Sequence, residues 1–200
     1  MPLPSSPASV RNRAPLLEVL RRWLPASGTV LEVASGLGEH AAWFAADLPD
    51  IRWQPTDPSP EALDILAARC EAAARPNLLP PLMLDASQPD SWPVDHADAV
   101  VCINMIHISP WAATEGLMAG AARRLPPGGV LVTYGPYLEA DIPTAASNVA
   151  FDADLRRRNP AWGLRDLETV RAEAASHGLV FAERVAMPAN NLCLLFRRPA

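Results

Sequence analysis

The sequence predicts an α/β fold with a seven-stranded, mostly parallel sheet, a C-terminal antiparallel hairpin and helices on both faces. Three observations support this prediction. Short apolar segments rich in Val, Ile and Leu alternate with segments of helical periodicity, which is typical of parallel strands joined by right-handed crossovers. A glycine turn over 34–38 follows the first of these strands. Two further strand-like segments end the chain, with only a short link over 187–191 between them.

The first half of the chain predicts an arm, a helix and three strands separated by helices. Residues 1–9 are rich in proline and serine and predict a flexible arm, while 10–200 predict a single domain. Leucines at helical spacing predict a helix over about 13–23. Ser59 is expected to cap a later helix. The remaining elements expected here are strands over 29–33, 51–54 and 82–84, and helices over 38–47 and about 60–74.

The second half repeats this alternation and then changes. A buried strand over 99–104 precedes a helix that ends at Leu125, before a Pro-Pro-Gly-Gly stop. Because the last two strands are joined by a short link, they are expected to pair antiparallel. The other expected elements are a strand over 130–134, helices over 151–158 and 166–176, and strands over 180–185 and 192–196.

A glycine turn and several polar residues indicate one ligand site. Gly36 and Gly38 allow the backbone to turn sharply beside a ligand, and the following helix directs free N–H groups to the same place. In parallel α/β sheets, ligands bind beyond the carboxyl ends of the strands, where the strand order reverses. Five polar residues fall at or just beyond such ends, namely Glu32, Asp57, Asp85, Asn104 and Tyr134.

Composition and charge exclude several kinds of function. The net charge of −5 argues against a nucleic-acid surface, and no apolar run is long enough to cross a bilayer, so a soluble, cytoplasmic protein is expected. The chain contains no lysine, which excludes a P-loop and a pyridoxal Schiff base. The three cysteines suggest no disulfide framework. The four histidines lack the spacing of a compact metal site, so no metal is expected.

Several phrases of the sequence carry a family resemblance. They are LEVASGLGEHAAWFA from Leu31, WQPTD from Trp53, NMIHISPW from Asn104, EGLMAGAARRLPPGG from Glu115, YGPY from Tyr134, SNVAFDADLRRRNPAWGLRD from Ser147 and MPANNL from Met187. With these phrases the chain resembles the class I S-adenosylmethionine-dependent methyltransferases, and more closely the methyltransferase-like 26 family, whose substrate is unassigned. The resemblance implies a Rossmann-like class I methyltransferase fold.

The resemblance also implies S-adenosylmethionine as the cofactor and places its contacts. Glu32 would lie near its methionine or ribose, and Asp57 would bind the ribose hydroxyls. Asp85 and Ala86 would meet the adenine edge. The other implied contacts are Ala34, Gly36 and Gly38 in the turn, with Ala34 in the place of a first glycine, and Asn104 and Met105 beside the transferring methyl group.

His107 is the candidate catalytic residue. It follows the fourth strand and precedes a capped helix, so its imidazole can face the pocket and accept a proton from a hydroxyl or an amine, although a purely structural histidine fits the same position. Aromatic and amide side chains in the covering loops suit a small, partly planar acceptor. The expected acceptor contacts are Asn12, His40, His107, Tyr134, Tyr137, Asn148, Phe151, Trp162, Asn190 and Asn191.

The predicted function is methyl transfer to oxygen or nitrogen of a small molecule by direct displacement, in which the protein mainly positions the reactants. Two alternatives remain open. A catalytically silent protein can use the same pocket as an S-adenosylmethionine sensor or scaffold. Gly36, Gly38 and Ala41 also satisfy the GxGxxA pattern of nicotinamide-dependent oxidoreductases, with an acidic residue about 20 positions on. The expected partner is the small-molecule acceptor, with neither nucleic acid nor membrane, and the sequence does not indicate an oligomeric state.

Overall fold

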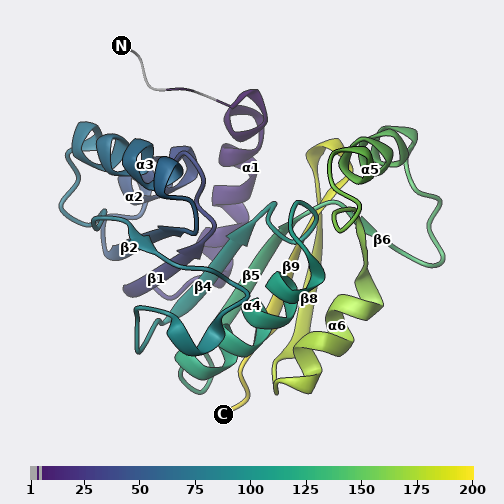
Figure 1. Ribbon diagram of the computed structural model, residues 1–200. Helices are drawn as coiled ribbons and strands as arrows, with labels where there is room; N and C mark the ends of the chain where they lie inside the picture. The colour runs from purple at the N-terminus through teal and green to yellow at the C-terminus, as the bar shows by residue number, and fades with distance from the viewer. Residues whose placement is uncertain (1–3, 5) are drawn as a thin grey trace.

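The computed structural model describes residue 4 and residues 6–200, and one sheet of seven strands runs through it. The strand order is β3-β2-β1-β4-β5-β9-β8 (Figure 1). All pairs are parallel except β5 with β9 and β9 with β8. This arrangement confirms the predicted fold. The strands are β1 (Gly28–Val33), β2 (Ile51–Asp57), β3 (Leu82–Met83), β4 (Ala99–Ile103), β5 (Val130–Gly135), β8 (Val180–Met187) and β9 (Asn191–Arg197).

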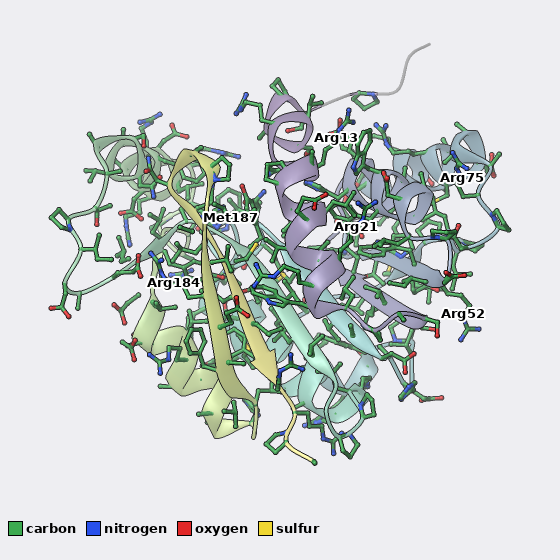
Figure 2. All side chains as sticks on the ribbon, turned by 180° about the vertical axis from the view of Figure 1, so that it is seen from behind. Arg13, Arg21, Arg52, Arg75, Arg184 and Met187 are labelled. Atoms are coloured by element: carbon green, nitrogen blue, oxygen red, sulfur yellow. The ribbon has the colours of Figure 1, made fainter. Side chains whose placement is uncertain are left out.

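Helices cover both faces of the sheet. One face carries α1 (Pro7–Trp23), α2 (Glu39–Asp47) and α3 (Pro60–Ala73), and the other carries α4 (Trp111–Arg124) and α6 (Leu167–Ser176). Figure 2, seen from behind, shows α1 running along the sheet beside the β8–β9 hairpin. The remaining elements are α5 (Ala146–Arg158), the short pair β6 (Tyr137–Leu138) and β7 (Arg165–Asp166), and two 3-10 turns, Pro89–Ser91 and Pro188–Asn190.

Strand side chains alternate between two apolar cores. Leu31 and Val33 of β1 face the core beneath α4 and α6, whereas Val30 faces the core beneath α1 and α2. In the second core Phe44 and Trp53 are both fully buried, with ring centroids 5.3 Å apart. Each buried side chain of this size contributes about 1.5 to 3 kcal/mol of transfer free energy. The two cores fix the sheet, and with it the edge at which the β1, β2 and β4 carboxyl ends meet.

Three boundaries differ from the sequence prediction by three residues or more. Helix α1 begins at Pro7, because Ser6 caps it and a proline suits the first helical position, so residues 7–9 are helical rather than part of an arm. The arm predicted for 1–3 and 5 falls outside the described residues. Helix α5 begins at Ala146 instead of 151.

Strand β2 continues to Asp57, past the predicted end at residue 54. Pro55 has no N–H to donate, which normally interrupts a strand. Here it lies between the contact of Trp53 with Leu78 and the pairing of Thr56 with Leu82, where the neighbouring segment is not paired. The strand therefore continues without losing a ladder hydrogen bond at this position.

Candidate functional site

A cavity opens where the strand order reverses. Strand β1 pairs with β2 on one side and with β4 on the other. The strands that follow β1 directly in sequence, β2 and β3, therefore extend the sheet on one side of it, and β4 and β5 extend it on the opposite side. At the carboxyl ends of these strands lies a cavity of about 480 Å³, which we call the switch-point cavity. Its volume lies within the range of about 300 to 1,000 Å³ that is usual for small-molecule sites. It is lined by Val33, Ala34, Gly36, Asp57, Pro58, Leu84–Ser87, Ile103, Met105, Ile108–Pro110, Ala112 and Ala113.

The turn after β1 brings its backbone to the wall of this cavity. Ala34, Gly36 and Gly38 all have positive φ angles, of 59°, 56° and 76°. A Cβ atom added at Gly36 would meet nothing within 4 Å, so this part of the backbone faces open space. A Cβ atom at Gly38 would lie 2.2 Å from Cδ1 of Leu66, so only glycine fits there. Ala34 adopts the left-handed region despite its Cβ, at a cost of about 1 to 2 kcal/mol.

Asp57 is held at the end of β2 by two backbone amides. Its Oδ2 accepts a hydrogen bond from Gly36 N at 2.9 Å, and its Oδ1 accepts one from Ser59 N at 3.0 Å. Burial raises the pKa of this carboxyl group, although both hydrogen bonds act against the increase. Each carboxylate oxygen can accept a second hydrogen bond. Asp57 can therefore bind two neighbouring hydroxyl groups without giving up its backbone contacts.

Asp85 and Ala86 also line the switch-point cavity. The Oδ1 atom of Asp85 accepts hydrogen bonds from the backbone N and the Oγ of Ser87, at 2.8 and 2.7 Å. These bonds fix the loop after β3, and Asp85 remains exposed at the rim. A Cβ atom added at Gly116 of α4 would lie 2.0 Å from the carbonyl oxygen of Ala86. The close approach of the helix therefore sets the position of this wall.

Glu32 lies in the sheet and does not line the switch-point cavity. Its side chain is buried, and its Oε2 accepts a hydrogen bond from Trp53 Nε1 at 2.8 Å. Burial raises the pKa of Glu32 to about 7, opposed by the hydrogen bonds from Trp53 and Ser35. Glu32, predicted to lie near a methionine or ribose group, is thus not among the lining residues, and its hydrogen bond with Trp53 joins β1 to β2.

A second cavity of about 460 Å³ adjoins the first and shares Ile108 with it. We call it the amide cavity, because four asparagine side chains reach its wall from separate parts of the chain. In Figure 1, the start of α1, helix α5 and the tip of the β8–β9 hairpin all lie above the same edge of the sheet. The lining residues are Ala8, Asn12, Asn104, His107, Ile108, Tyr134, Pro136, Ser147, Asn148, Phe151, Arg158, Ala189 and Asn191.

His107 lies in this cavity between β5 and α5. A Cβ atom added at Gly135 would lie 2.8 Å from its Cε1, so the imidazole packs directly on the backbone of β5. On its other side the ring meets Phe151 edge-on, with centroids 5.6 Å apart. Burial, with a smaller contribution from the positive charge of Arg165, lowers the pKa of His107 to about 4. The imidazole is therefore neutral at pH 7 and has an unprotonated nitrogen that can accept a proton.

A buried hydrogen-bond chain supports Tyr134, another residue of the amide cavity. His40 Nε2 lies 2.7 Å from Asn12 Oδ1, and the Asn12 side chain also hydrogen-bonds to the Tyr134 hydroxyl group. Burial lowers the pKa of His40 to about 4, so its neutral ring donates to the Asn12 oxygen and the Asn12 amide donates to Tyr134. His40, a predicted acceptor contact, lines neither of these two cavities and bonds to Asn12, which lines the second.

Three further predicted acceptor contacts lie outside the amide cavity. The Tyr137 hydroxyl group is 2.8 Å from Thr133 Oγ1 in the apolar core. Trp162 lies under the Arg158 guanidinium group, 5.2 Å from the ring centroid. Asn190 and Tyr137 both line a smaller cavity of about 200 Å³. The carbonyl oxygen of Asn190 accepts a hydrogen bond from Asn148 Nδ2.

The two cofactor contacts predicted at the end of β4 separate between the cavities. Met105 lines the switch-point cavity, and Asn104, whose φ angle is 64°, lines the amide cavity. The sequence interpretation missed Ile108, which joins the two cavities, and Arg158. The sequence does carry a signal for Arg158. It ends a run of three arginines, and only two acidic residues, Asp152 and Asp154, precede that run in the same helix, so one arginine is left without a nearby carboxylate.

Neither a metal cluster nor a membrane span is found in the described part of the chain. Across residue 4 and residues 6–200, no three His, Cys, Asp or Glu side chains come together in a way that could hold a metal ion. Within the same residues, every helix is too short or too polar to cross a bilayer.

Solved structures of methyltransferases share this fold. An O-methyltransferase family protein from Burkholderia thailandensis is 20% identical, with a TM-score of 0.81 over 96% of this chain and 58% of that one. An O-methyltransferase family 2 protein from Planctomyces limnophilus, in complex with apigenin, is 21% identical, with a TM-score of 0.81 over 96% and 57%. CalO1, a methyltransferase in calicheamicin biosynthesis in its SAH-bound form, is 18% identical, with a TM-score of 0.73 over 96% and 55%. The chain therefore spans a little more than half of these proteins.

A family model assigns the chain more directly. The model, described as "Protein of unknown function (DUF938)", matches residues 3–198. This match does not confirm the methyltransferase-like 26 family that the sequence phrases suggested. Because the match covers nearly the whole sequence, this chain belongs to the DUF938 family.

Proposed function

We propose that this protein transfers a methyl group from S-adenosylmethionine to an oxygen or nitrogen atom of a small molecule. The observation that carries the proposal is the pair of adjoining cavities at the reversal of strand order. One has the glycine turn and Asp57 of a nucleoside site, and the other has a neutral histidine and a set of amides. Ile108 belongs to both, so ligands in the two cavities would meet there.

The residues of the switch-point cavity fit this cofactor. Asp57 can accept hydrogen bonds from both ribose hydroxyl groups, and the open backbone at Gly36 leaves room for the amino-acid part. Apolar side chains from the loop after β3 and from β4 offer a slot for the adenine ring. The charged residues of the lining are Asp57 and Asp85, which favour a cationic sulfonium over the pyrophosphate of a nicotinamide cofactor.

Bound S-adenosylmethionine supplies a methyl carbon whose bond to the sulfonium sulfur breaks as the bond to the acceptor forms, leaving a neutral thioether. The protein's own part is to position the acceptor and to receive its proton. Tyr134 and the cavity amides can hold the acceptor, and positioning of this kind corresponds to effective molarities of about 10⁵ to 10⁸ M. The neutral His107 ring can accept the proton at its free nitrogen and pass it to solvent.

Calorimetric titration tests the cofactor assignment. The wild-type protein should bind S-adenosylmethionine and S-adenosylhomocysteine but not NAD⁺ or NADH. Asp57→Ala should weaken binding roughly 10- to 150-fold, because it removes hydrogen bonds to a charged group worth about 1.5 to 3 kcal/mol. Asp64→Ala, an exposed position on α3, is the matched control and should leave affinity unchanged. Unchanged affinity in Asp57→Ala would contradict the assignment.

A product screen separates an enzyme from a sensor. The protein is incubated with a small-molecule extract and methyl-labelled S-adenosylmethionine, and labelled products are detected by mass spectrometry. Labelled small molecules that disappear when Asp57→Ala replaces the wild type would support methyl transfer. Tight cofactor binding without any labelled product would favour the sensor or scaffold, and binding of NADH alone would favour the oxidoreductase.

A further inference from the structure

We propose that the methyl acceptor is a small hydroxy acid whose carboxylate is bound by Arg158. This inference rests on the proposed function, because it assigns the amide cavity to the acceptor, and it adds the acceptor's charge and orientation. The observations that carry it are the pairing of the arginines in α5, the charge of the cavity lining, and the arrangement of residues along α5.

Arg158 is the one arginine of its run that is not paired with a carboxylate in the described residues. Arg156 Nε lies 2.8 Å from Asp152 Oδ2, and Arg157 pairs with Asp154. Arg158 instead lies over the Trp162 ring, 5.2 Å from its centroid, and lines the amide cavity. A guanidinium group presents a planar set of donors that matches a carboxylate, and contact with the Trp162 ring favours one position of this exposed side chain. Arg158 can therefore bind an anionic ligand, because no carboxylate of the described residues pairs with it.

The rest of the lining is neutral, although the whole molecule is acidic. The protein has a net charge of −5, yet no Asp or Glu side chain is among the residues that line the amide cavity. Other arginines add to the positive field, because Arg165 acts on His107 and Arg11 acts on Tyr134. A protonated amine would find no carboxylate here to compensate its desolvation, whereas a carboxylate would find the Arg158 cation.

Helix α5 orients the acceptor. Ser147, Phe151 and Arg158 stand at i, i+4 and i+11, so they share one face of the helix, and all three line the cavity. Phe151 contacts the His107 ring, and Arg158 lies seven residues further along, about 10 Å at the helical rise of 1.5 Å per residue. A carboxylate at Arg158 would thus leave the other end of a small molecule near His107, where a hydroxyl group can lose its proton.

Ligand-observed NMR with matched acids and amides tests the inference. The full-length protein is first saturated with S-adenosylhomocysteine. Pairs that differ only in charge are then titrated, such as 4-hydroxybenzoate against 4-hydroxybenzamide and 3-hydroxybutyrate against 3-hydroxybutanamide. At least one acid should bind ten-fold or more tightly than its amide. Arg158→Gln should abolish this preference, and Arg157→Gln, which alters the paired neighbour outside the cavity, should retain it.

Three outcomes of the acid and amide titrations would overturn the inference. These are amides that bind as well as acids throughout the panel, an acid preference that survives Arg158→Gln, and an equal loss of preference in Arg157→Gln. The affinity for S-adenosylhomocysteine is measured for each variant. A loss of cofactor affinity in Arg158→Gln would place the guanidinium group at the cofactor and also overturn the inference. If the wild type does not bind S-adenosylhomocysteine, the proposed function fails first; if it binds without acid preference, only this inference fails.

Discussion

The ring of His40 and the side chain of Asn12 form a buried hydrogen bond, 2.7 Å from Nε2 to Oδ1, that joins α2 to α1 beside the amide cavity. Both side chains are about 7% exposed, so neither group can exchange its partner for bulk water without local movement. Asn12 also bonds to Tyr134, and the pair therefore fixes the direction in which the Asn12 amide points. His40, which lines neither the switch-point cavity nor the amide cavity, thus sets the orientation of the Asn12 amide, which lines the amide cavity.

His40→Ala tests this control. The substitution leaves the buried Asn12 oxygen without a donor, and we expect a loss of about 1 to 3 kcal/mol in the free energy of unfolding, measured with urea. S-adenosylmethionine affinity should change less than two-fold, whereas the KM for the acceptor should rise. His96→Ala, at an exposed histidine, should change neither the free energy of unfolding nor the KM for the acceptor. Loss of cofactor binding in folded His40→Ala would place His40 at the cofactor instead.

Glu32→Gln should make the protein more stable at neutral and alkaline pH. In the folded state burial raises the pKa of Glu32 to about 7, from an ordinary value of 4.5, so the native protein binds more protons than the unfolded chain between these pH values. Stability is therefore lost as the pH rises through this range, by roughly 3 kcal/mol. Glutamine carries no charge and can still accept from Trp53, so its advantage should be largest above pH 7.

The measurement is urea unfolding of both proteins from pH 4.5 to pH 8. The difference between them should grow with pH and level off above pH 7. A difference that does not depend on pH would mean that the Glu32 carboxyl group titrates normally in the folded state.

His107→Gln should show the opposite dependence on pH. Burial lowers the pKa of His107 to about 4 from 6.5, so the unfolded chain binds more protons between these values and wild-type stability falls as the pH falls. The full effect is roughly 3 kcal/mol, reached near pH 4. Glutamine does not titrate, so whatever its stability at pH 7, the difference from wild type should move in its favour on acidification. A parallel pH dependence of both proteins would contradict this prediction.

Ala34→Gly should stabilise the protein slightly and leave the cofactor site in place. The φ angle of 59° at Ala34 costs about 1 to 2 kcal/mol for a residue with a Cβ, and part of the gain is offset by the greater freedom of glycine in the unfolded chain. We expect a net gain of up to about 1 kcal/mol in urea unfolding. Ala74→Gly, with a φ angle of 48° at the exposed end of α3, lines neither cavity and is the control; it should gain at least as much, because Ala34 also packs against the core. Destabilisation in Ala34→Gly alone would show that the methyl group packs favourably.

The sequence predicted the sheet, and it placed Asp57 and Asp85 at one edge of it, because both predictions depend on short-range patterns. The glycine turn follows its strand directly, and Asp57 and Asp85 follow theirs, so parallel order alone brings them to one edge. The predicted end of β2 was wrong because Pro55 resembles a stop, and its harmless position between two paired segments is a tertiary fact.

The lining of the amide cavity was harder to predict because it depends on contacts between distant segments. His40 and Asn12 are 28 residues apart, and Asn148 bonds to Asn190 across 42 residues. The sequence pattern does not show that the Tyr137 hydroxyl group hydrogen-bonds to Thr133. It also does not show that the Trp162 ring contacts Arg158. Amides and aromatics in loops identified the region, and packing decided which of them line it.

Gly116→Ala should displace the wall of the switch-point cavity that contains Asp85 and Ala86, although Gly116 itself does not line the cavity. The added Cβ would lie 2.0 Å from the carbonyl oxygen of Ala86, a backbone atom that can move only with its loop. Alanine favours a helix by about 1 kcal/mol over glycine, so a free position would be stabilised. We expect instead a loss of unfolding free energy of about 1 to 3 kcal/mol and weaker S-adenosylmethionine binding, because Asp85 and Ala86 are displaced together. Gly116→Ser should weaken binding at least as much. A stabilised protein with wild-type affinity would mean that α4 and this loop separate easily and that their close packing does not shape the cavity.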